Sequence, residues 1–190
     1  MGENAVPLVV LAVVVLLPIV YVLGMYNRLI KLRNTIKESW SNVDTELKRR
    51  YDLIPNLVNT VKGYAKHERE TFEAVVKARQ AAIDYKGSPK GKADAENQLV
   101  RGLRSLLAVA EAYPDLKASG NFLQLQHELV NTEDRIQAAR RFYNGNVRTM
   151  NTLVQSVPSN LIASLFGFQE EDYFEVEDAR VREAVTVSMD

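Results

Sequence analysis

The chain has 190 residues, and its 24 basic and 24 acidic side chains give a formal net charge of zero. This length is enough for one domain with a hydrophobic core. The sequence contains no cysteine, so disulfides and thiolate metal sites are excluded. Nucleic-acid binding is not indicated, because it would favour a larger net positive patch with interleaved aromatic residues.

An uncharged and almost wholly apolar run of 21 residues occupies positions 5–25. A helix rises about 1.5 Å per residue, so this run would reach about 31 Å, close to the thickness of a bilayer's hydrocarbon core. A cleaved signal peptide would need basic residues before the run and a small-residue cleavage site after it, and neither is present. The sequence therefore predicts a retained transmembrane helix over about residues 5–26, kinked at Pro18.

Basic residues follow this run, whereas none precedes it. Arg28, Lys31 and Arg33 lie directly beyond its C-terminal end. By the positive-inside rule, this asymmetry places the short N-terminus outside the cell and the larger domain in the cytoplasm. The lipid bilayer is thus the first predicted partner.

From Leu29 to Val76, apolar residues recur at steps of three and four, which predicts a helix that leaves the bilayer and continues to about residue 83. Pro55 interrupts this pattern, because proline lacks a backbone donor and clashes with the carbonyl of Tyr51. Two readings stay open: the helix kinks at Pro55, or the chain reverses there and forms a compact four-helix bundle. The apolar stripe is in phase on both sides of Pro55, which favours the kink.

Glycines and a proline predict a loop over residues 84–92. A helix is then predicted over residues 93–112, and a third over residues 121–157, where near-heptad spacing calls for a coiled-coil-like partner. Pro158 ends the third helix, and a short helix over residues 161–166 is closed by Gly167. The predicted fold is all-α, with an N-terminal transmembrane helix that continues into a long antiparallel helical bundle.

The short helix has two interpretations. It could be a membrane-binding amphipathic segment, but it lacks the lysine-rich polar face that such helices usually carry. A cap over the open end of the bundle core is the favoured interpretation.

The predicted domains are a transmembrane segment (1–27), a helical bundle (28–168) and an acidic tail (169–190). The tail holds eight acids and two bases, whereas residues 27–168 carry an excess of basic side chains. The tail could lie against this basic bundle, but a solvated and partly disordered tail is favoured.

Helix lengths lead to a further expectation. A first helix of about 57 residues beyond the membrane would be roughly 85 Å long and would extend past its shorter partners. Its membrane-proximal apolar stripe would then have no partner within the chain. Because exposed apolar stripes mark interfaces, the sequence predicts a homo-oligomer that associates near the membrane.

Known catalytic and metal-binding patterns are absent. His67 and His127 are each followed by glutamate, but Thr71 and Asn131 stand where a zinc-protease helix needs a second histidine. The Glu-x-x-His pattern of di-iron bundles is absent as well. We therefore predict no catalytic residue, no cofactor, no metal and no enzymatic activity.

Six residues are candidates for structural or interaction roles. Asp52 lies close to Pro55 in the sequence, and with Arg49 or Arg50 it could form a buried polar clamp that holds a helix pair in register. The basic clusters at 48–50 and 140–141 otherwise predict solvated faces with salt bridges to Asp52, Glu133 or Asp134. Trp40, Pro55 and Tyr143 complete the set.

Several stretches of this chain resemble the LemA family in order and spacing. They are residues 40–58 (WSNVDTELKRRYDLIPNLV), 63–68 (GYAKHE), 78–79, 111–118 (EAYPDLKA), 122–133, 136–144 (IQAARRFYN) and 167–168. The resemblance runs from the apolar segment to about residue 174, and only the last sixteen residues look idiosyncratic.

The resemblance implies a bacterial inner-membrane protein with one N-terminal span, an N-terminus outside and a cytoplasmic helical domain. It implies no established enzymatic activity and transfers no catalytic residue. One family branch is associated with building magnetosome membranes, which suggests a scaffolding role.

Two functions follow as hypotheses. The first is a membrane-anchored scaffold that self-associates and organises membrane or membrane proteins. The second is an adaptor that captures a protein client, such as a membrane protease or a signalling protein.

Overall fold

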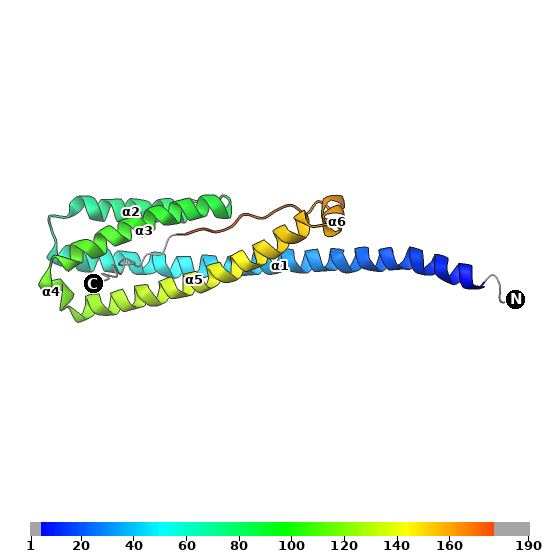
Figure 1. Ribbon diagram of the computed structural model, residues 1–190. Helices are drawn as coiled ribbons and strands as arrows, with labels where there is room; N and C mark the ends of the chain where they lie inside the picture. Colours follow the sequence, from blue (N-terminus) through cyan, green and yellow to red (C-terminus); the bar gives the residue numbers. More distant parts are fainter. Residues whose placement is uncertain (1–4, 177–190) are drawn as a thin grey trace, which may run out of the picture. The chain divides into compact units, whose positions relative to one another are not determined.

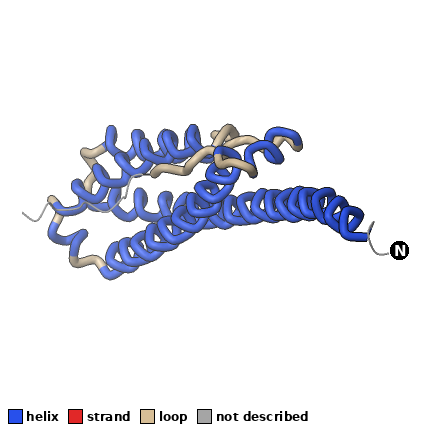
Figure 2. Tube along the Cα trace, turned by 45° about the vertical axis from the view of Figure 1, so that its right-hand side comes forward, coloured by secondary structure: helices blue, strands red, loops and turns tan. Residues whose placement is uncertain are grey.

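The structure is a computed structural model that describes residues 5–176. Over these residues the chain forms helices joined by turns and one extended segment, with no strand (Figure 2). The predicted all-α fold is therefore confirmed. The helices are α1 (Ala5–Tyr64), α2 (Arg69–Asp84), α3 (Pro89–Glu111), α4 (Pro114–Lys117), α5 (Gly120–Gln155) and α6 (Ser159–Leu165), as labelled in Figure 1.

The chain divides into two compact units. The proximal unit comprises Met1–Ser39 and Asn144–Glu171, and the bundle unit comprises Trp40–Tyr143 and Asp172–Asp190. Two helices, α1 and α5, contribute residues to both units. The site described below lies wholly within the bundle unit.

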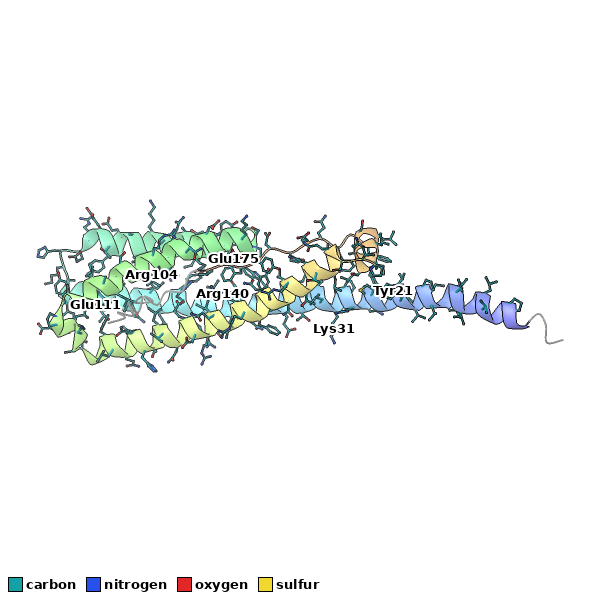
Figure 3. All side chains as sticks on the ribbon, viewed as in Figure 1. Tyr21, Lys31, Arg104, Glu111, Arg140 and Glu175 are labelled. Carbon is teal, nitrogen blue, oxygen red and sulfur yellow. The ribbon has the colours of Figure 1, made fainter. Side chains whose placement is uncertain are left out.

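The N-terminal part of α1 leaves its large apolar side chains exposed. Between Val10 and Leu23 the exposed large aliphatic side chains are valines, leucines and Ile19, with exposed fractions from 48% to 65%. In the described part of the chain, α1 is the helix long and apolar enough to cross a membrane. A core helix of a soluble protein would bury such a surface. In Figure 3, Tyr21 lies within this segment, near its C-terminal end, and Lys31 lies in the polar stretch beyond it.

Helix α1 runs through Pro55 without interruption, so the proposed reversal at this proline is wrong. The chain instead turns over residues 65–68, where the amide of Glu68 donates to the carbonyl of Ala65 at 3.2 Å. The predicted single helix to residue 83 is therefore wrong too. The physical reason is visible in the sequence, because no apolar residue lies between Ala65 and Phe72 to hold another turn against a core.

In the bundle unit, α2 and α3 lie side by side and antiparallel (Figures 1 and 2). The hydroxyl of Ser88 accepts the amide of Gly91 and caps α3, and Pro89 occupies its first turn. Helix α3 therefore begins four residues earlier than expected. At the contact with α2, a Cβ on Gly102 would meet Val75 Cγ2 at 3.4 Å, which is ordinary van der Waals contact.

The proximal unit buries the membrane-proximal apolar stripe of α1. Leu29 and Ile36 are buried, as are Val147 and Met150 of α5 and Ile162 of α6. The expectation that this stripe lacks a partner within the chain is therefore wrong. The prediction failed because α5 and α6 supply the missing apolar surface inside the same unit.

Helix α6 ends in a Schellman motif. The amide of Gly167 donates to the carbonyl of Ser164, and the amide of Phe168 donates to the carbonyl of Ala163 at 2.9 Å. Gly167 has a φ of 70°, which a residue without a side chain adopts at no steric cost. The predicted closure at Gly167 is thus confirmed.

The first part of the acidic tail packs against the protein. Residues 169–176 are extended, and the side chains of Phe174 and Val176 are buried. For these residues, the favoured picture of a solvated tail is wrong, because two apolar side chains anchor the segment. Residues 177–190 lie outside the described part of the chain.

Candidate functional site

Arg50 lies at the centre of a buried cluster of charges. Its Nη1 atom donates to both carboxylate oxygens of Glu133, at 2.9 and 3.2 Å, and its Nη2 atom donates to Glu96. Arg50 and Glu96 are fully buried, and Glu133 is nearly so. Arg50 comes from α1, Glu96 from α3 and Glu133 from α5, so one guanidinium joins three helices.

Two more side chains complete this buried charge cluster. The hydroxyl of Tyr51 donates to Glu96, and Lys92 Nζ lies 3.9 Å from Glu96 Oε1. Lys92 also donates to the carbonyl of Ala82 on α2 at 2.7 Å, and its ammonium lies 5.5 Å from the centre of the Tyr51 ring. Two cations and two carboxylates therefore give the cluster a net charge of zero, and contacts reach all four long helices of the bundle unit.

Electrostatics favour the charged form of Arg50 and the neutral form of Tyr51. Burial alone would lower the pKa of Arg50, but the Glu133 and Glu96 carboxylates outweigh it and raise this pKa above its ordinary value. Burial, together with the Glu96 carboxylate, raises the pKa of Tyr51 well above that of a free tyrosine. Arg50 thus stays charged and Tyr51 stays neutral at physiological pH.

The contacts of this cluster join side chains of different helices. Its charged groups are buried among the helices that supply them. Removing one partner of such a buried ion pair would leave an uncompensated charge, which typically costs about 3–5 kcal/mol. The cluster consequently holds α1, α3 and α5 in one register.

Pro55 shapes the neighbouring turn of α1. In an uninterrupted helix, the amide of residue 55 would donate to the carbonyl of Tyr51, but proline has no amide hydrogen. The Nε atom of Arg79, from α2, donates to this carbonyl at 2.7 Å. Arg79 therefore supplies the hydrogen bond that Pro55 cannot make, and the proline ring itself lies on the exposed side of α1.

The predicted clamp of Asp52 with an arginine is corrected by this geometry. Arg50 belongs to a buried clamp, but Asp52 is exposed, and Arg49 is exposed and pairs with Glu46 at 3.4 Å. Each residue turns α1 by about 100°, so positions 49 and 52 point away from the core that position 50 enters. The true partners, Glu96 and Glu133, lie far along the chain, and only Glu133 was among the partners considered.

Two other candidates, Trp40 and Tyr143, meet in an aromatic cluster. Their ring centroids are 5.2 Å apart, and the ring of Phe174 lies edge-on to Trp40 at 5.3 Å. The Tyr143 hydroxyl donates to the carbonyl of Asp172 at 2.9 Å, and Asn97 and Arg140 donate to the carbonyls of Glu175 and Val176. Side chains of α3 and α5 thereby hold the extended segment 172–176. Figure 3 labels Arg140 and Glu175.

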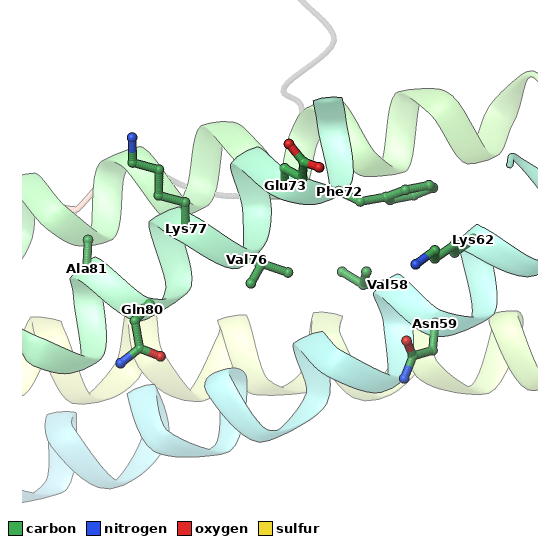
Figure 4. A pocket seen from close by; sticks show the side chains of 9 residues that line it. All are labelled: Val58, Asn59, Lys62, Phe72, Glu73, Val76, Lys77, Gln80 and Ala81. Atoms are coloured by element: carbon green, nitrogen blue, oxygen red, sulfur yellow. The ribbon is translucent and has the colours of Figure 1, made fainter. Parts of the chain in front are cut away.

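A groove lies between α1 and α2 in the bundle unit (Figure 4). Its volume is about 740 Å³, and its apolar residues include Val58, Phe72 and Val76. Lys62 and Lys77 are among its polar residues, and both are exposed. This groove was not predicted from the sequence, because it depends on how closely the two helices approach.

The two histidines lie on the surface. His67 is in the turn after α1, and Nδ1 of His127 lies 3.1 Å from Nδ2 of Asn131. Across residues 5–176, no three His, Asp or Glu side chains gather in a way that could hold a metal ion.

Comparison with known proteins identifies a family and several relatives. The model of the LemA family matches residues 39–189, which is more than half of the chain. Magnetosome protein MamQ of Magnetospirillum gryphiswaldense is 25% identical over 202 residues, covering 92% of this chain and 74% of the relative. Magnetosome protein MamQ 2 of Paramagnetospirillum magneticum is 26% identical over 179 residues, covering 81% of this chain and 66% of the relative.

A relative outside the magnetosome proteins is also similar. Protein LemA of Metamycoplasma hominis is 28% identical over 173 residues, covering 90% of this chain and 75% of the relative. This chain therefore spans about two thirds to three quarters of the length of these relatives.

Proposed function

Because the chain belongs to the LemA family, we propose that it is a single-span bacterial inner-membrane protein whose helical domain acts as a non-enzymatic scaffold. In this proposal the chain self-associates and organises the membrane or other membrane proteins. The family match confirms the resemblance seen in the sequence. The family, together with the exposed apolar part of α1, indicates a membrane-associated protein.

The observation that carries the proposal is the contrast between the two parts of α1. Its N-terminal part exposes a run of large apolar side chains, whereas its C-terminal part contributes to a sealed core with a neutral, paired charge cluster. Lipid is the solvent that suits the first part. Exposed Arg28, Lys31 and Arg33 favour a cytoplasmic position for the residues that follow the span.

The relatives also favour a scaffold. Two of them are named as magnetosome proteins. The resemblance to the LemA family associates one branch with building magnetosome membranes, and we extend a membrane-organising role to this chain. Self-association in this proposal uses exposed surfaces, because the stripe at Leu29 and Ile36 is already buried within the chain.

The test is the mass of the full chain extracted from membranes in a mild detergent. We expect native mass spectrometry to show a defined multimer with no second protein needed to form it. A monomer over a range of protein concentrations would contradict the scaffold. Extraction of the chain by alkaline carbonate would contradict the membrane span itself.

The groove between α1 and α2 favours an adaptor as the second candidate. Val58 and Val76 would contact an apolar segment of a client, and Lys62 and Lys77 would favour a carboxylate on that segment. Val76 is exposed, so Val76→Glu should block a client without disturbing the core. Under the adaptor hypothesis, one dominant protein co-purifies with the natural chain and is lost from this variant, whereas a scaffold keeps its multimer.

A further inference from the structure

Helix α6 buries one face and exposes an apolar face. Ile162 and Ala163 are buried in the proximal unit, as expected for a cap over its core. The other face exposes Leu161 and Leu165, whose exposed fractions are 67% and 75%. Val157 and Phe166, which flank the helix, are 78% and 45% exposed. Leu161 and Leu165 are four residues apart and therefore share a side of the helix. A cap alone does not account for this outer face.

The exposed face of α6 lies beside the end of the apolar segment of α1. The ring of Phe166 is 4.7 Å from the ring of Tyr26, and the ring of Phe168 is 6.1 Å from it. Tyr26 follows the apolar run directly, and Leu23, one turn earlier, is exposed. Aromatic rings are enriched at the level where a transmembrane helix leaves the hydrocarbon. These contacts place α6 at that level.

Charges around this position suit the boundary between lipid and water. The guanidinium of Arg33 lies 5.1 Å from the centre of the Phe168 ring. Arg33 is seven residues beyond Tyr26, or about 10 Å further along α1, so it lies on the water side of the hydrocarbon boundary. Arg28 and Lys31 are exposed nearby and can attract lipid phosphates.

We infer that α6 is a second contact with the bilayer, lying in its interfacial layer with Leu161, Leu165 and Phe166 directed at the acyl chains. This inference rests on the membrane span of the proposed function. It adds that lipid also covers the exposed face of α6, which is not part of the span. Amphipathic helices that bind membranes usually carry lysine on their polar face, and α6 carries none. Here the basic residues at the membrane surface come from α1 instead.

The absence of cysteine makes the inference testable with single labels. The full chain is reconstituted in phosphatidylcholine and phosphatidylglycerol vesicles, with a fluorophore on Leu165→Cys, Leu17→Cys or Asn34→Cys. Leu17 lies within the apolar run, and Asn34 is exposed eight residues beyond Tyr26, or about 12 Å further along α1. Lipids with a spin label near the headgroup or at the acyl-chain end then quench each fluorophore according to depth.

We expect the label at Leu165 to be quenched most by the shallow spin label, and the label at Leu17 most by the deep one. The label at Asn34 should respond to iodide in water and to neither lipid. If Leu17 is quenched and Leu165 is not, the inference is wrong while the span stands. If neither is quenched, the membrane span itself fails.

A second variant tests whether the apolar face is responsible. Adding Leu161→Gln to the chain labelled at position 165 should reduce shallow quenching, because the face that enters the lipid becomes polar. Unchanged quenching would overturn the inference. A label at position 165 that is shielded from both lipid and iodide would overturn it too, since a protein surface would then cover α6.

Discussion

At the scale of single residues, Pro55 and Arg79 form a matched pair. Pro55 leaves the carbonyl of Tyr51 without its helical donor, and Arg79 from α2 donates to that carbonyl. A buried carbonyl without a partner typically costs about 1–3 kcal/mol. The arginine therefore compensates for a defect that the proline creates.

This pairing predicts that the effects of the two residues on stability are coupled. Arg79→Met should lower the free energy of unfolding by about 1–3 kcal/mol, because the Tyr51 carbonyl loses its donor. In a Pro55→Ala background the new amide can donate to the same carbonyl, so Arg79→Met should cost less. A double-mutant cycle from denaturant unfolding measures the difference.

The matched control is Arg69→Met, also on α2, where the exposed arginine pairs with Glu73 on the surface. We expect this change to stay within about 0.5 kcal/mol. Equal costs of Arg79→Met in both backgrounds would show that Arg79 acts independently of Pro55.

Tyr51 predicts a pH dependence of stability. Its pKa is raised in the folded chain by burial and by Glu96, whereas an unfolded tyrosine titrates near pH 10. Folding therefore favours the protonated form. Its contribution is fully present below about pH 10 and is lost as pH rises towards the folded pKa, because the unfolded chain then binds fewer protons.

The comparison with Tyr51→Phe isolates this effect from the other tyrosines. At pH 7 the variant should be less stable by about 1.5–3 kcal/mol, since the charged Glu96 carboxylate loses the hydrogen bond that the Tyr51 hydroxyl donates to it. Above about pH 10 the difference should shrink. Denaturant unfolding at a series of pH values measures it, and a difference that grows with pH would refute this account.

The buried charge cluster leaves a signal in the sequence. Arg50 lies three residues after Leu47 and four before Ile54, so it is in phase with the apolar stripe of α1. Glu133 lies four residues after Leu129 and three before Ile136, so it too is in phase with an apolar stripe. A charged residue in phase with an apolar stripe must be paired when it is buried. The signal indicates burial, but it does not identify the partner.

At the scale of elements, most helices were predicted from apolar spacing and from prolines and glycines. The regions of α3, α5 and α6 were expected, and Gly167 does close α6. The main error was the join of α1 and α2 into one helix. Val61, Ala65 and Phe72 are all buried, and their helical phase concealed the polar turn between them.

The extended segment 172–176 predicts a local change in the variant Phe174→Ala. Phe174 is fully buried and contacts Trp40, the chain's single tryptophan. Truncating a buried phenylalanine typically costs about 3–5 kcal/mol. We expect this cost to exceed the free energy of local opening of a short extended segment that a few hydrogen bonds hold in place. The segment should detach and expose Trp40 to water.

We expect the fluorescence of Trp40 to shift to longer wavelength and limited proteolysis to cut the segment earlier. Phe142→Ala is the control, because Phe142 is exposed on α5. An unchanged Trp40 spectrum in the Phe174 variant would show that the segment does not shield this ring.

At the scale of the whole molecule, the apolar surfaces are distributed differently from our expectation. The stripe at Leu29 and Ile36 was expected to mediate association, but the proximal unit buries it. Exposed large apolar side chains gather instead on the N-terminal part of α1 and on the outer face of α6, while others such as Val76 and Phe142 are exposed singly. Self-association and lipid contact therefore have to be sought at these surfaces and at the groove between α1 and α2.

The sequence by itself determined the helical class, the apolar segment and its basic flank, because periodicity, length and charge are local properties of the chain. The tertiary structure alone decided which partners meet. Arg50 pairs with Glu96, which is 46 positions away in the sequence, and with Glu133, which is 83 positions away. Trp40 likewise contacts the distant Phe174. Helical phase tells which side of a helix is buried, but the partner depends on how the helices are brought together, and that is set by the summed packing of the core rather than by any one segment.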